Sequence, residues 1–274
     1  MQLPDRPEPL SVPVVDTHCH LDVTERHSGL EPGTAIDWAT QVGVSRIVQI
    51  GCDVAGSRWA VEAAERWSSV VAGVAIHPND AARLRSDLPA ALALVEDLAS
   101  HPRVRAVGET GLDYYRTRDE AGQAVQRDAF AAHIAMATAH GKTLVVHDRD
   151  AHADVLAVLD SAGIPARVVM HCFSGDADFA RACVDRGAYL SFAGPVTFKP
   201  NEELRAALAV TPLDRVLVET DAPYLTPMPH RGRPNASYLI PHTVRFMADT
   251  LGLDVAVLCR ALADNAADAF GGAW

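Results

Sequence analysis

The chain has 274 residues, of which 24 are Lys or Arg and 35 are Asp or Glu, so its formal net charge is −11. This acidic balance argues against a protein that coats nucleic acid through many phosphate contacts, because such binding needs an excess of Lys and Arg. The five cysteines contain no CxxC pair, the N-terminus is polar, and no long apolar run lacks charge. These features argue against a disulfide framework, an export signal and a membrane span, so we expect a globular cytoplasmic protein.

Short apolar runs rich in Val and Ile recur along the chain, separated by Ala-, Leu- and Arg-rich stretches of helical character. The predicted strands are, in chain order, Val12–Thr17, Arg46–Ile50, Val70–Ile76, Val104–Val107, Thr143–Val146, Arg167–Met170, Ala188–Phe192 and Arg215–Val218. The clearest predicted helices are Asp119–His140, Asp176–Arg186, Ala236–Thr250 and Asp254–Phe270. Strands that alternate with helices are typical of a parallel sheet covered on both faces.

Eight strand–helix units in a chain of this length predict an α/β fold, a TIM-type (β/α)8 barrel. We expect a single domain over residues 1–274, with residues 1–12 as a polar N-terminal lead. An open, doubly wound sheet is the alternative, because a number of strands does not establish closure. The Pro- and Gly-rich segment Pro223–Pro234 follows the last strand, so we interpret it as a loop over the barrel mouth rather than a linker.

Potential metal ligands follow the predicted strands. His18 and His20 come at the end of the first strand, where alternate residues of an extended chain face the same side. The later strands lead into His77, Glu109, His147, His171, Glu219 and Asp221. One histidine after a strand is usually just a polar residue that enters a loop. Because the pattern repeats at strand after strand, and barrel enzymes place their chemistry at this end, it favours a metal centre.

The segments DTHCHLD, GVAIHP, GETGLDYY, HDRDA, HCFSG and ETDAPYLTP closely resemble, in this order, the TatD family of metal-dependent deoxyribonucleases. That family belongs to the amidohydrolase-like barrel hydrolases, and the resemblance covers the chain from about Val14 to about Phe270. It implies two divalent cations, Mg, Mn or Zn, held by His18, His20, Glu109, His147, His171 and Asp221. In this resemblance Glu109 bridges the two cations, and Asp221 is the candidate general base.

Four further residues are interpreted as substrate contacts: His77, Arg149, Lys199 and Tyr114. The guanidinium of Arg149 matches the geometry of a phosphate, and Lys199 offers a second cation. Tyr114, with its neighbour Tyr115, is suited to stacking on a base. The competing interpretation is that these cations are solvated and that the tyrosine pair packs a loop. His77 matches a family histidine near the cleft, and we do not count it as a cation ligand.

The resulting functional hypothesis is a divalent-metal-dependent phosphodiester hydrolase, a DNase that trims single-stranded ends in the 3′–5′ direction with a water activated by two cations. The first alternative is an ester or amide hydrolase such as a D-aminoacyl-tRNA deacylase, because two cations activate water equally well for attack on a carbonyl. The second is a non-catalytic barrel that binds metal or nucleic acid. We expect DNA ends as the partner, no membrane association, and a monomer.

Overall fold

The computed structural model describes residues 3–272. Eight parallel strands pair in sequential order in one sheet. They are β1 (Val14–Cys19), β2 (Val44–Gly51), β3 (Val70–Val74), β4 (Val104–Asp113), β5 (Thr143–Arg149), β6 (Val168–Met170), β7 (Tyr189–Phe192) and β8 (Val216–Val218). The end of β1 meets the segment that follows β8, where the amide of Asp221 donates to the carbonyl of His18 at 2.9 Å. The predicted TIM-type barrel is therefore confirmed, and the open sheet is wrong.

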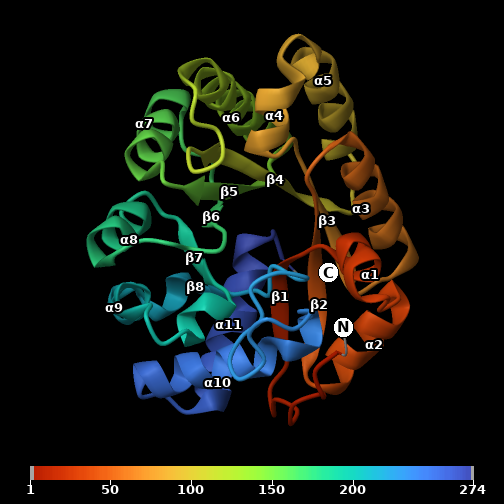
Figure 1. Ribbon diagram of the computed structural model, residues 1–274, viewed down its shortest axis with the longest axis vertical. Coiled ribbons are helices and arrows are strands. Elements are labelled where there is room, and N and C mark those ends of the chain that lie inside the picture. Colours follow the sequence, from red (N-terminus) through yellow and green to blue (C-terminus); the bar gives the residue numbers. More distant parts are fainter. Residues whose placement is uncertain (1–2, 273–274) are drawn as a thin grey trace.

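Helices surround the strands on the outside of the barrel (Figure 1). They are α1 (Leu21–Ser28), α2 (Pro32–Gln41), α3 (Val54–Arg66), α4 (Pro78–Leu84), α5 (Leu88–Ala99), α6 (Glu120–His140), α7 (His152–Ala162), α8 (Ala177–Val184), α9 (Glu202–Val210), α10 (Ile240–Leu251) and α11 (Val255–Ala269). Local capping sets their ends: the carboxylate of Asp119 accepts the amide of Gly122 at the start of α6, and left-handed Gly141 ends it. Within residues 3–272, no helix is long and apolar enough to span a bilayer.

Two apolar layers fill the molecule. The outer layer lies between the strands and the helices and includes Val14, Ile47 and Leu144. The inner layer, which includes Val48, Val145 and Leu217, is made of side chains from the strands together with Phe270 from the end of α11. Asn265 in α11 also donates to the carbonyls of Leu213 and Val216 at the start of β8, both at 2.8 Å. The end of α11 thus packs against the amino end of the barrel.

The fourth strand is longer than predicted, and this changes the setting of Glu109. We expected the strand to end at Val107, but β4 runs to Asp113 with a shift of register between Val107 and Thr110. Beyond the shift, Gly111 lies so close to β5 that an added Cβ would be 2.1 Å from the carbonyl oxygen of His147. Glycine alone permits this approach. Glu109 therefore lies within the sheet, and not beyond the apolar run Val104–Val107 that was predicted as the strand.

Two other predicted boundaries are corrected. The first strand begins at Val14 and reaches Cys19, so His18 lies within the sheet. The helix predicted over Ala236–Thr250 begins later: Ser237–Leu239 forms a 3-10 turn, and α10 starts at Ile240. Pro241 lies in the first turn of α10, where its missing N–H and its fixed φ angle are tolerated. This proline therefore marks the helix start that the apolar pattern placed too early.

His133, in the middle of α6, is fully buried and hydrogen-bonded as a neutral ring. Its Nε2 accepts the amide hydrogen of Ile76 at 3.1 Å, and its Nδ1 lies 2.7 Å from the carbonyl oxygen of Ala129. A second ring proton would face the amide of Ile76, so the site has no place for the charged form. Burial accordingly lowers the pKa of His133 from 6.5 to about 4.

This histidine should make the fold sensitive to acid. As the pH falls from 6.5 towards about 4, His133 binds a proton in the unfolded chain but not in the folded chain. The free energy of unfolding should drop by about 3 kcal/mol over that window because of this one group. Urea unfolding at a series of pH values should show a smaller acid loss for His133→Gln than for the wild type. Equal losses in the two proteins would contradict the prediction.

Candidate metal centre

Glu109 lies at the centre of a cluster of imidazoles, and its two carboxylate oxygens face different members of it. Oε1 is 3.6 Å from Nε2 of His18 and 3.7 Å from Nε2 of His20. Oε2 is 3.1 Å from Nδ1 of His147 and 3.0 Å from Nε2 of His171. Burial would raise the pKa of Glu109, but the charge of His171 and the hydrogen bonds from His147 and His171 hold it well below its usual range. This ionised carboxylate with two separate sets of neighbours is the arrangement that a bridge between two cations requires.

His18 shows that the cluster suits a cation. The side chain is 0% exposed, and within residues 3–272 neither of its ring nitrogens has a hydrogen-bond partner. Burial lowers the pKa of His18, so the ring is neutral, and its Nε2 lies inside the cluster, 3.6 Å from Oε1 of Glu109. A buried polar group without a partner is costly, whereas a neutral imidazole is the commonest protein ligand of metal ions. The donor set therefore fits a bound cation.

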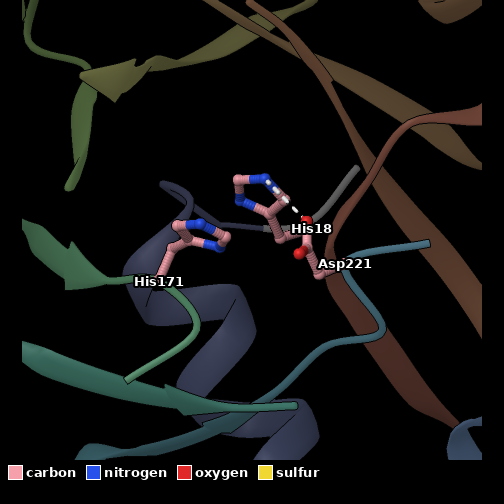
Figure 2. A group of neighbouring side chains, drawn as sticks. All are labelled: His18, His171 and Asp221. Carbon is pink, nitrogen blue, oxygen red and sulfur yellow. Dashed lines mark ion pairs between the residues drawn. The ribbon is translucent and has the colours of Figure 1, made fainter. Parts of the chain in front are cut away.

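Asp221 enters the cluster from the loop that follows β8. Its Oδ1 lies 3.4 Å from Nε2 of His20 and 3.9 Å from Nε2 of His18, and Figure 2 shows it beside His18 and His171. The rings of His18 and His171 are stacked with their centroids 3.7 Å apart. Asp221 has a positive φ of 53°, a conformation that aspartate tolerates better than most residues. Burial would raise the pKa of Asp221, but the hydrogen bond with His20 and the neighbouring imidazoles lower it, so the carboxylate is ionised.

The barrel therefore brings all six predicted ligands together. Ligand atoms within 4.8 Å of one another form three overlapping groups in the described chain, namely His18 with His171 and Asp221, His18 with His20 and Glu109, and His77 with Glu109 and His147. The number and identity of the cations stay predictions.

His77 shares the cluster but is oriented as a hydrogen-bond donor. Its Nδ1 accepts the amide hydrogen of Asn79 at 3.1 Å and so caps the start of α4. The neutral ring therefore carries its proton on Nε2, which lies 3.8 Å from Oε2 of Glu109. Burial lowers the pKa of His77 to about 4, so the ring stays neutral. A protonated nitrogen cannot coordinate a metal, which supports the prediction that His77 is not a cation ligand.

The sequence model described as TatD related DNase matches residues 15–271. The chain belongs to the TatD family. The metal-dependent hydrolase named TatD from Mycobacterium tuberculosis (strain ATCC 25618 / H37Rv) is 44% identical to it, over 95% of this chain and 99% of that protein. The metal-dependent hydrolase named YabD from Bacillus subtilis (strain 168) is 37% identical, over 86% of this chain and 89% of that protein. Both names state a class of reaction and no substrate.

Solved structures of the TatD family share the fold. The crystal structure of YJJV, a TatD homolog from Escherichia coli K12, superposes with a TM-score of 0.87 at 23% identity, covering 95% of this chain and 98% of that one. A TatD family hydrolase from Entamoeba histolytica superposes with a TM-score of 0.83 at 18% identity, covering 96% of this chain and 100% of that one. At these identities the likeness shows the fold alone. The predicted resemblance to the TatD family is confirmed by the sequence comparisons.

Two buried acidic residues lie against the TatD-motif histidines: Asp113 was not predicted, and Glu219 was named only as a potential metal ligand after the eighth strand. Glu219 is fully buried, and its Oε1 accepts hydrogen bonds from Nδ1 of His171 at 2.9 Å and from the amide of Cys172 at 2.8 Å. Oδ2 of Asp113 lies 3.5 Å from Nε2 of His147 and accepts a hydrogen bond from Nδ2 of Asn79 at 2.8 Å. Asp113 and Glu109 are four positions apart in β4. Strand alternation could have identified Asp113 had the predicted strand been long enough.

Glu219→Gln should weaken cation binding without unfolding the protein. A neutral amide cannot replace the charged acceptor that fixes the ring of His171, and changes of this kind cost about 10–100-fold in metal affinity or activity. Calorimetric titration of the metal-free protein with Mn²⁺ or Zn²⁺ measures the loss directly. Glu202→Gln, on the exposed face of α9, is the matched control. An unchanged affinity in Glu219→Gln would show that His171 is oriented by other contacts.

The other residues predicted as substrate contacts lie around the barrel mouth, and they differ in exposure and in their partners. The hydroxyl of Tyr114 donates to Asp154 at 2.6 Å and accepts from Arg127 at 2.9 Å, so this side chain is held by α6 and α7. Its neighbour Tyr115 is 47% exposed, with the guanidinium of Arg149 3.9 Å from the centre of its ring. Lys199 is exposed after β7. The structure thus favours Tyr115, and not Tyr114, as the tyrosine that is available to a ligand.

Proposed function

We propose that this metal-dependent hydrolase of the TatD family cleaves phosphodiester bonds in DNA and trims single-stranded ends in the 3′–5′ direction. The observation that carries the proposal is Glu109, whose two oxygens face His18 and His20 on one side and His147 and His171 on the other. Two divalent cations, Mg, Mn or Zn, would supply a water of lowered pKa and positive charge for the transition state. The description of the family supports DNA as the substrate.

Asp221 is suited to the role of general base. Its side chain is 15% exposed, so it reaches the cluster and is also open to the mouth of the barrel. The neighbouring imidazoles keep it ionised and able to accept a proton. A positioned carboxylate of this kind contributes about 10²–10⁴-fold to the rate of a proton transfer.

His77 complements Asp221 as a donor. Because its Nδ1 caps α4, its Nε2–H is directed towards the cluster whether or not substrate is bound. We assign this group to a hydrogen bond with a non-bridging oxygen of the scissile phosphate. Such a donor stabilises the negative charge that develops during displacement at phosphorus.

The mouth of the barrel supports a nucleic-acid end as the substrate. The guanidinium of Arg149 lies over the ring of Tyr115, and an arginine held against a ring can still donate its N–H groups to a phosphate. Arg231, on the loop after β8, is stacked in the same way on Phe198, 4.4 Å from its ring centre and next to Lys199. These cations create a local positive field that attracts phosphate, in a chain whose net charge is −11.

Digestion of a labelled single-stranded oligonucleotide with Mg²⁺, Mn²⁺ or Zn²⁺, resolved by fragment length, tests the proposal. We expect a ladder that shortens from the 3′ end and is absent with Asp221→Asn. If the same preparation leaves DNA intact but deacylates D-aminoacyl-tRNA, the ester hydrolase alternative replaces the proposal. DNA binding without turnover of either substrate would leave the non-catalytic barrel.

A further inference from the structure

Tyr224 is an exposed aromatic side chain beside the metal cluster that none of the interactions above uses. It lies three residues after Asp221, and its side chain is 51% exposed. Its ring centre is 6.4 Å from that of His20, at an interplanar angle of 64°. In the part of the chain that the structure describes, its hydroxyl has no hydrogen-bond partner and no Arg or Lys is stacked on its ring.

The backbone of Tyr224 is held in place although its ring is exposed. Its amide donates to the carbonyl of Asp221 at 2.9 Å, and its carbonyl accepts from Nδ2 of Asn235 at 2.6 Å. Asn235 is itself fully buried and also donates to the carbonyl of Thr220 at 3.0 Å. The backbone therefore holds the ring next to His20. Because this loop is already ordered, stacking of a ligand on the ring costs little conformational entropy.

Tyr115, the other exposed tyrosine at the mouth, differs in this respect. The guanidinium of Arg149 lies 3.9 Å from its ring centre, and that of Arg118 lies 5.8 Å from it. Tyr115 thus serves to orient cations, and Tyr224 offers an uncovered face. Tyr115 follows β4, which contributes Glu109 to the cluster, and Tyr224 lies in the loop after β8, which contributes Asp221.

We propose that Tyr224 is the stacking platform for the base of the terminal nucleotide whose phosphodiester lies at the metal cluster. The inference rests on the proposed function and names the part of the substrate that is recognised. The scissile phosphodiester is separated by one sugar from the base of each nucleotide that it joins, so a phosphate at the cluster brings the terminal base near Tyr224, beside His20. Every base has a π face, so this contact is tolerant of sequence. A base stacked inside a duplex cannot offer that face, so the platform predicts a preference for single-stranded ends.

Kinetics on two substrates test the assignment. One oligonucleotide ends in an ordinary nucleotide, and the other has an abasic sugar at the same position. Tyr224→Leu should raise KM for the ordinary end by roughly 5- to 150-fold and leave KM for the abasic end unchanged, since loss of one base–aromatic stack has that effect on binding. Tyr224→Phe should behave like the wild type. Equal effects of Tyr224→Leu on both substrates, or no effect on either, would overturn the proposal.

Tyr115→Leu is the matched control because Tyr115 is 47% exposed and also lies at the mouth. It releases Arg149, so it should weaken the binding of ordinary and abasic ends alike, and more strongly at low salt.

A fluorescent probe separates failure of this inference from failure of the proposed function. A terminal 2-aminopurine is quenched when it stacks, and Asp221→Asn slows its removal. We expect quenching with Asp221→Asn and its loss in the double variant that also carries Tyr224→Leu. Quenching by a protein that cleaves no DNA would support the platform and refute the nuclease. Cleavage of DNA without quenching would refute the platform and support the nuclease.

Discussion

Glu109→Gln is expected to lower kcat/KM by about 10³-fold or more and to reduce the number of bound cations. Within the described chain, Glu109 is the only carboxylate with one oxygen facing His18 and His20 and the other facing His147 and His171. An amide has no negative charge and offers one oxygen in place of two, so cations bridged by it would repel each other without compensation. Bound cations contribute several kcal/mol to transition-state stabilisation, and each 1.36 kcal/mol corresponds to about a tenfold change in rate.

Metal analysis after dialysis, together with kcat/KM, measures both parts of this prediction. Glu25→Gln is the matched control, because Glu25 is an exposed glutamate of α1 away from the cluster. It should keep the metal content and the activity of the wild type. A Glu109→Gln protein with a full complement of cations would mean that histidines and Asp221 suffice to hold them, and the bridging role would have to be abandoned.

Asp221→Asn is expected to lower kcat by about 10²–10⁴-fold, with a smaller change in KM. The variant keeps the shape of the side chain and removes the charge that accepts a proton. Glu109, His147 and His171 are untouched, so the cation on their side of the cluster should remain. Metal content therefore distinguishes the two variants. Asp221→Asn should lose turnover but keep at least one cation, whereas Glu109→Gln should bind fewer cations.

Asp214→Asn, an exposed aspartate just before β8, controls for the loss of one negative charge. Metal content and single-turnover rates on one oligonucleotide separate binding from chemistry in all three proteins. If Asp221→Asn keeps the wild-type rate of the chemical step, another group accepts the proton, and the carboxylate only holds a cation.

The residues that define the fold were predictable because their signals are local. A buried parallel strand needs an apolar run, and each of the eight strands of the barrel contains one, so the predicted strands overlap all eight. The boundaries were less predictable where an irregular backbone continues a strand. No sequence pattern marked the register shift after Val107, so β4 was predicted to end before Glu109.

The candidate ligands were predictable for a similar reason. His18 and His20 alternate within one short segment, and the other ligands fall in motifs that resemble those of one family. The carboxylates that contact those ligands were harder to assign, because Asp113 was not predicted and Glu219 was named only as a potential ligand. Asp113 contacts His147 from an adjacent strand, and Glu219 contacts His171 from across 48 residues of chain. In the sequence, buried carboxylates of this type cannot be distinguished from residues that cap a helix or begin a turn, because their contacts form only when the strands pair.

By itself, the sequence determined the eight alternating units, the types of side chain at the strand ends and membership of the TatD family. Only the tertiary structure decided that β1 and the end of β8 meet, which sets Asp221 beside His18. It also decided which oxygen of Glu109 faces which histidine, that His77 is a donor, and that Tyr224 and not Tyr114 is uncovered. The reason is physical: apolar periodicity and residue type are local properties of the chain, whereas distances, protonation and exposure arise when barrel closure brings distant segments into contact.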